Sequence, residues 1–118
     1  MLTSVAEHAE LLRLRSVDYL QPDAPRSADH ALLELLALAE HAGVSLAPHF
    51  AMEIHVHLSA AYPHTSWVEH FEWLEPLWNE RLELRAGRMV VPPRPGLGLS
   101  LSEQAHAWTT GTSTFGRA

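Results

Sequence analysis

The chain has 118 residues and a mass of 13.1 kDa, the size of one ordinary domain, and its 47% hydrophobic content is enough to bury a core. Its 14 acidic residues outnumber its 8 basic residues, all arginine, and the net charge of −6 argues against nucleic-acid or anionic-membrane binding. Without cysteine or lysine, the chain offers no disulfide, thiolate nucleophile or lysine base. Its apolar runs are short, so we expect a soluble, cytoplasmic protein.

The first third of the sequence predicts a helix, a strand and a second helix. Ser4 and Glu7 have capping-box spacing, which predicts a helix over 4–15. Strand-forming residues over 16–21 follow and end at a proline. Alanine and leucine then recur with helical spacing over 27–42, so we expect a longer helix there.

The middle of the sequence continues this alternation. We expect a short strand over 44–47, a helix over 51–61 and a third strand over 67–71. Strands that alternate with helices predict an α/β fold with a parallel sheet. Each unit of a (β/α) barrel takes about 30 residues, so the chain holds about three βα units. Such an open sheet leaves its edges unpaired, which predicts an oligomer or association with a larger structure.

The last third of the sequence has a different pattern. Strand-like segments on both sides of Ala86–Gly87 predict a hairpin, and a loop rich in proline and glycine follows. The capping-box spacing of Ser100 and Glu103 predicts a short helix before a loose tail. We therefore divide the chain into an α/β part over 1–81 and a C-terminal segment over 82–118.

Three polar residues lie at or near the carboxyl ends of the predicted strands. Asp23, His49 and Glu69 would share the rim at which α/β barrels and open sheets carry their active sites. If the first two strands are neighbours, Asp23 can meet His49 and fix the tautomer of a general acid or base. Each residue alone is more simply explained as a turn or surface residue. Because all three lie at or near predicted strand ends, a catalytic rim is as plausible as that simpler explanation.

A second hypothesis concerns a metal ion. A helix that began at His49 would place His49, Glu53 and His57 on one face, at a spacing that suits a metal site. The alternative, which we favour, is that these are partly exposed helix positions in a chain with nine histidines. We expect surface positions for the histidines that belong to no motif: His8, His30, His41, His64, His70 and His106.

An aromatic and apolar cluster follows the third predicted strand. In so acidic a chain, we interpret it as part of a core or subunit interface rather than a base-stacking platform. Its members are Trp67, Phe71, Trp73, Leu77 and Trp78.

Four long segments carry a recognisable pattern: VDYLQPDAPR, AEHAGVSLAPHFAMEIHVHLSAAYP, WVEHFEWLEPLWNERLELRAGRMVV and PGLGLSLSEQA. They resemble the C-terminal portion of acid-sugar dehydratases in the mandelate racemase/muconate lactonizing enzyme family of the enolase superfamily. Within that family, the resemblance is strongest to the dehydratases of L-talarate and galactarate. It covers nearly the whole chain, with an interruption near residues 27–31.

The resemblance implies the C-terminal part of a TIM-type (β/α) barrel, whose hairpin and final helix pack on a capping domain. In this family Mg²⁺ and a general base remove the proton next to a carboxylate of a sugar diacid, and hydroxide leaves as water. The family's histidine and aspartate dyad falls on His49 and Asp23. Its eighth-strand glutamate falls on Glu69, where it is expected to hydrogen-bond the substrate carboxylate as the enolate develops.

The same resemblance implies that part of the machinery is missing from this chain. The family's lysine base and its three carboxylate ligands for Mg²⁺ correspond to positions before Met1, which matches an interior methionine. Residues 27–30 also depart from the family pattern. We therefore expect the 118-residue chain alone to be inactive. The alternative is a non-catalytic interaction subunit that pairs through its strand edges and a surface formed by Trp67, Trp73 and Trp78.

Overall fold

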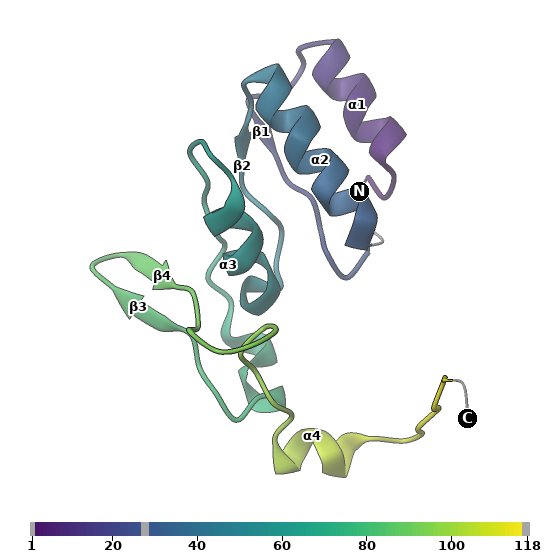
Figure 1. Ribbon diagram of the computed structural model, residues 1–118, viewed down its shortest axis with the longest axis vertical. Helices are drawn as coiled ribbons and strands as arrows, with labels where there is room; N and C mark the ends of the chain where they lie inside the picture. Colours follow the sequence, from purple (N-terminus) through teal and green to yellow (C-terminus); the bar gives the residue numbers. More distant parts are fainter. Residues whose placement is uncertain (1, 27–28, 117–118) are drawn as a thin grey trace.

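Helices and very short strands alternate through the first half of the chain. The computed structural model describes residues 2–26 and 29–116, and Figure 1 shows their arrangement. These residues form a mixed α/β structure in which no barrel is closed. The elements are α1 (Val5–Arg13), β1 (Tyr19–Leu20), α2 (Asp29–Ala42), β2 (Ser45–Leu46), α3 (Met52–Ala61), the 3₁₀ helix η1 (Glu72–Leu77), β3 (Glu83–Arg85), β4 (Arg88–Val90) and α4 (Glu103–Trp108).

The ends of the first two helices follow from local sequence. The predicted capping box is confirmed, because Ser4 Oγ accepts the Glu7 N–H at 3.3 Å and the Glu7 carboxylate accepts the Ser4 N–H at 3.1 Å. Helix α2 ends before Gly43, whose φ of +67° is the left-handed conformation that glycine adopts without strain. The first two residues of the predicted helix, 27 and 28, lie outside the described residues.

The first sheet is parallel, as the alternating pattern predicts. Leu20 of β1 is paired with Leu46 of β2, and Leu46 in turn bridges Ser66 in a parallel sense. The prediction of a third strand over 67–71 is wrong, since its pairing stops at the Trp67 N–H, which donates to the Leu46 carbonyl at 2.8 Å. Beyond that point the chain turns away, and its side chains contact the loop after β2 instead.

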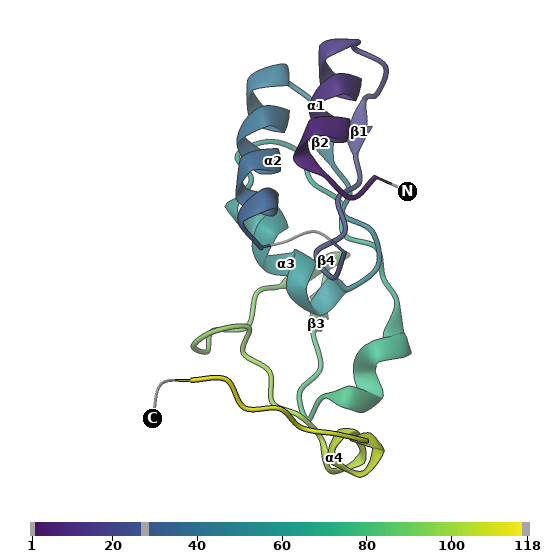
Figure 2. The ribbon, with the colours of Figure 1, turned by 90° about the vertical axis from the view of Figure 1, so that its right-hand side faces the viewer.

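A small apolar core holds these elements together. Helices α1 and α2 lie side by side next to the β1–β2 pair (Figures 1 and 2). Strand β1 alternates accordingly, with Leu20 buried and Tyr19 half exposed. The core consists of Leu12, Leu20, Leu35, Ala39, Leu46 and Tyr62.

The C-terminal segment begins with the predicted hairpin. Strands β3 and β4 are antiparallel, and both turn residues, Ala86 and Gly87, have positive φ, as a tight two-residue hairpin turn requires. The predicted start of the last helix is wrong. Ser102, not Ser100, caps α4 by accepting the Ala105 N–H at 3.1 Å, because Glu80 binds the backbone and hydroxyl of Ser100.

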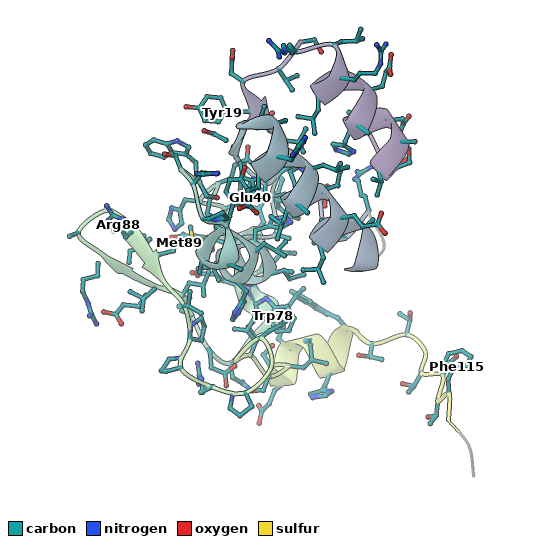
Figure 3. The ribbon with its side chains drawn as sticks, turned by 45° about the horizontal axis from the view of Figure 1, so that its top comes forward. Tyr19, Glu40, Trp78, Arg88, Met89 and Phe115 are labelled. Carbon is teal, nitrogen blue, oxygen red and sulfur yellow. The ribbon has the colours of Figure 1, made fainter. Side chains whose placement is uncertain are left out.

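Hydrogen bonds tie this segment to the end of η1 and the residues after it. The Asn79 N–H donates to the Ser100 carbonyl at 3.0 Å, and the Ser102 N–H donates to the Leu77 carbonyl at 2.9 Å. Beyond α4 the chain has no regular structure up to residue 116 and is exposed, as Phe115 in Figure 3 illustrates. None of the described helices is long and apolar enough to cross a membrane.

Candidate active site

Asp23 and His49 follow the two paired strands. Parallel pairing continues past both strands, because the Ala47 N–H donates to the Leu20 carbonyl and the His49 N–H donates to the Pro22 carbonyl, each at 2.9 Å. This register brings the residues after β1 and β2 to the same edge of the sheet. The His49 Nδ1 atom lies 3.1 Å from Asp23 Oδ2, so the expected contact between the two side chains is present.

Burial differs sharply between the two partners. The Asp23 side chain is 5% exposed, whereas the His49 side chain is 42% exposed. Because the carboxylate accepts, Nδ1 of the neutral imidazole carries the proton and Nε2 is left as the free base. Arg26 Nε also lies 3.3 Å from Asp23 Oδ2. Within the described part of the chain, Asp23 Oδ1 is buried and has no hydrogen-bond partner.

Glu69 reaches the same loop by a different route. Its Oε2 accepts the backbone N–H of Phe50 at 2.7 Å, so it contacts the residue after His49 rather than the imidazole ring. Phe50 has a φ of +65°, a conformation that is uncommon for residues other than glycine. Glu69 therefore holds the backbone of the loop that carries His49. The structure brings all three predicted residues, Asp23, His49 and Glu69, to the same edge of the sheet.

A hollow of about 290 Å³ lies beside the Asp23–His49 pair. Its lining includes Tyr19, Gln21 and His8 together with the pair itself. His8 is 3% exposed, and its Nδ1 lies 2.7 Å from the Ser4 carbonyl, so the expectation of a surface position is wrong for this histidine. The side chain of His30 lies outside the described residues. The others are exposed as predicted: His41, His64, His70 and His106.

His55 is a residue of the site that no sequence motif indicated. This residue of α3 is completely buried, and its Nε2 accepts the Ala24 N–H at 3.0 Å. Burial lowers the pKa of His55, which favours the neutral ring that such an acceptor requires. Helical spacing was the available signal, because His55 shares a face with the buried residues Met52 and Val56.

The metal-site hypothesis on α3 is wrong. The helix begins at Met52, so His49 does not share its face, and His57 Nε2 donates to the Leu97 carbonyl at 3.1 Å. Glu53 is 3% exposed, which also excludes the favoured alternative of a partly exposed position for this residue. Burial raises the pKa of the Glu53 carboxyl, and neither oxygen has a hydrogen-bond partner among the described residues.

Aromatic rings border the site on the side of Glu69. Phe50, Phe71 and Trp73 contact one another edge to face, with ring centroids 5.4–6.0 Å apart. Trp73 is 75% exposed and Trp67 is 63% exposed. Of the two predicted roles of the cluster, the core is therefore excluded for these two tryptophans, and the subunit interface stays a prediction.

Known proteins are similar to this chain over nearly its whole length. Residues 1–105 match the family described as enolase C-terminal domain-like. The chain is 56% identical to the L-talarate/galactarate dehydratase of Salmonella typhimurium over 118 residues, which cover 99% of this chain and 30% of that protein.

Solved structures extend the same similarity. The crystal structure of L-talarate dehydratase from Polaromonas sp. JS666, complexed with Mg and L-glucarate, is 66% identical and superposes with a TM-score of 0.91 over 94% of this chain and 31% of that one. That of the Salmonella typhimurium LT2 protein superposes with a TM-score of 0.94. The chain thus spans about 30% of the length of these relatives. It belongs to the mandelate racemase/muconate lactonizing enzyme family, as part of the enolase-like C-terminal domain of a TIM-barrel enzyme.

Proposed function

We propose that this chain is the C-terminal catalytic part of an acid-sugar dehydratase, a carbon–oxygen lyase that acts on a galactarate-like or L-talarate-like diacid. The observation that carries the proposal is the contact of His49 Nδ1 with the buried Asp23 carboxylate at 3.1 Å, in a chain that is 56% identical to such a dehydratase. Residues 1–81 would form the last three βα units of the barrel. Residues 82–118 would return to a capping domain.

His49 moves a proton in this mechanism. Its Nε2 either takes the proton from the carbon next to the substrate carboxylate or, as the acid, gives a proton to the departing hydroxide, which leaves as water. Asp23 holds the Nδ1–H and stabilises the imidazolium that forms when Nε2 is protonated. The exposed His49 ring and the buried Asp23 carboxylate suit these two roles, because only the histidine has to reach the substrate.

Glu69 acts on the other side of the reacting centre. With Oε2 bound to the Phe50 N–H, we expect Oε1, when protonated, to donate a hydrogen bond to the substrate carboxylate as negative charge builds on it. The same residue keeps the His49 loop in place through that backbone contact. Loss of Glu69 would therefore disturb both substrate charge stabilisation and the position of His49.

The residues in this chain do not fit a Mg²⁺ site. No three histidine or carboxylate side chains of the described part gather closely enough to hold a metal ion, and the sequence has no lysine base. We therefore expect the 118-residue chain, taken alone, to leave galactarate unchanged. Association with the remaining part of a barrel would be required for turnover.

A chimera tests the proposal directly. The segment of the Salmonella typhimurium dehydratase that matches this chain is replaced by residues 1–118, and galactarate dehydration is followed. We expect activity, and we expect His49→Asn to lower kcat by about 10²- to 10⁴-fold. His41→Asn, at an exposed position on α2, is the matched control and should leave kcat unchanged. A folded chimera with no activity, or one indifferent to His49→Asn, would refute the proposal.

A second candidate function is that of a non-catalytic interaction subunit. The exposure of Trp67 and Trp73, at 63% and 75%, favours it, because large exposed apolar side chains often mark interfaces. Together with Trp78 and the strand edges, they would bind another protein, such as an intact relative. Light scattering of the chain mixed with the Salmonella typhimurium enzyme should then show a stoichiometric complex, which Trp73→Ala weakens. Two separate, unassociated species would dispose of this function.

A further inference from the structure

The turn that carries Asp23 is buried, and its carbonyls are bonded, that of Pro22 to the His49 N–H and that of Asp23 to the Arg26 N–H. Pro22, Asp23 and Ala24 are all buried. The Asp23 side chain is held by two contacts only in the described part of the chain, His49 Nδ1 and the half-exposed Arg26, both on Oδ2. Its other oxygen has no partner there. The position of the carboxylate therefore depends on the backbone of the turn.

One side chain from a distant part of the sequence binds that backbone. His55, 31 residues further along, accepts the Ala24 N–H on Nε2 at 3.0 Å. The ring is completely buried and lies on the face of α3 that also buries Met52 and Val56, so it cannot move without disturbing the packing. A buried backbone N–H left without an acceptor costs about 1–3 kcal/mol, which makes this bond a strong constraint on the turn.

The same helix belongs to the loop that presents His49. Between His49 and α3 lie only Phe50 and Ala51, and the His55 N–H donates to the Ala51 carbonyl at 3.0 Å. His55 is thus bonded to both sides of the dyad, through its ring to the turn of Asp23 and through its backbone to the loop of His49. An error in the placement of either loop would lengthen the 3.1 Å contact between the two catalytic groups.

We propose that His55 is a positioning residue that holds Asp23 against His49 by accepting the Ala24 N–H. The inference rests on the proposed function for its meaning in catalysis, although the positioning itself is a property of this chain. A neutral imidazole with its proton on Nδ1 is the form that performs the task. His55 does not touch the substrate in this arrangement.

The test is the tautomer of His49 in the full 118-residue chain, measured by long-range ¹H–¹⁵N NMR at mildly alkaline pH. In His55→Leu, which cannot accept the Ala24 N–H, we expect His49 to lose its Nδ1–H form in favour of the Nε2–H form common for a free imidazole. His55→Gln offers an acceptor oxygen near the position of Nε2, so it should restore the Nδ1–H form. Retention of that form in a folded His55→Leu chain would overturn the proposal.

A matched control separates positioning from general stability. Tyr62→Phe removes another buried hydrogen bond, from the Tyr62 hydroxyl to the Val44 carbonyl, without touching the Asp23 turn. It should lower stability and leave the His49 tautomer unchanged. An equal loss of the Nδ1–H form in Tyr62→Phe would contradict a specific role for His55.

If His55→Leu does not fold, a measurement on the unsubstituted chain tests the bond between His55 and Ala24 instead. The bond predicts a scalar coupling between the Ala24 amide nitrogen and an unprotonated His55 Nε2, and a protonated Nε2 would overturn the proposal. These outcomes are independent of dehydratase activity. An inactive chimera with the expected NMR results would refute the proposed function and leave the positioning role standing.

Discussion

Among the described residues, the N-terminal region up to residue 81 buries a core, whereas the C-terminal region, residues 82–116, buries little and is tied to its neighbour by hydrogen bonds. All six residues of the apolar core cluster belong to the first region. In the described part of the second, only Gly98 and Ala105 are buried. In Figure 1 the hairpin and α4 lie apart from α1 and α2, and α4 contacts η1.

This difference shows which part of the chain holds the candidate catalytic residues in place. Asp23, His49, Glu69 and His55 all lie in the region with the core, where packing fixes the backbone that carries them. The C-terminal region takes its position from contacts such as the Ser102 bond to Leu77. We therefore expect the contact between Asp23 and His49 to survive changes in the C-terminal region and to be lost with changes in the core.

The largest expected effect is that of Leu46→Ala. Leu46 is completely buried in β2, so removing its side chain leaves a cavity and should lower the free energy of unfolding by about 2–5 kcal/mol. Leu84→Ala, at a position 52% exposed in the hairpin, should change it by less than about 0.5 kcal/mol. Urea unfolding of both variants measures the two changes in the free energy of unfolding. Equal changes would mean that the two regions do not differ in how much they depend on buried apolar side chains.

A change of opposite sign is expected at Glu53. Because burial raises the pKa of this carboxyl, ionisation at neutral pH opposes folding, and Glu53→Gln should raise the free energy of unfolding by about 1 kcal/mol. The unfolded chain releases this proton near the ordinary pKa of 4.5, whereas the folded chain keeps it to a higher pH. The stability of the wild type therefore falls as the pH rises above 4.5. The stability gained by Glu53→Gln grows over the same range.

The matched control for Glu53 lies on α2. Glu34→Gln removes a carboxylate at an exposed position and should change stability little at any pH. Thermal unfolding of both variants between pH 4.5 and 8 is the measurement. A gain in Glu53→Gln that shrinks with rising pH would contradict the assignment of a raised pKa.

The most local effect is expected at Ser102. Its hydroxyl caps α4 and also donates to the Pro76 carbonyl at 2.6 Å, so Ser102→Ala should destabilise the local structure by about 1 kcal/mol. Hydrogen exchange should accelerate over 103–108 while the Ala24 amide keeps its protection. Faster exchange at Ala24 as well would show that the C-terminal region does support the dyad.

The features that the sequence predicts well are those decided by neighbouring residues. The Ser4 cap and the Ala86–Gly87 turn depend on hydrogen bonds and φ angles within a few positions. The meeting of Asp23 and His49 was also predictable, because parallel strands end at one edge. Whether they act in catalysis remains a prediction, and so does the role of Glu69.

The features that the sequence does not predict depend on distant partners. The bond between His55 and Ala24 spans 31 residues and has no local signature. Ser100 has the spacing of a cap, but Glu80 binds it instead and leaves the cap to Ser102. The strand formers of 67–71 likewise turn away from the sheet, because Glu69 and Phe71 contact Phe50.

The most direct test of the account is the tautomer of His49 in the unmodified 118-residue chain. The central claim is that this chain holds Asp23 and His49 as a dyad, with Nδ1–H donating to the carboxylate. Long-range ¹H–¹⁵N NMR at mildly alkaline pH should show a single Nδ1–H form of His49 that Asp23→Asn abolishes. An Nε2–H form, or a mixture unchanged by Asp23→Asn, would contradict the claim.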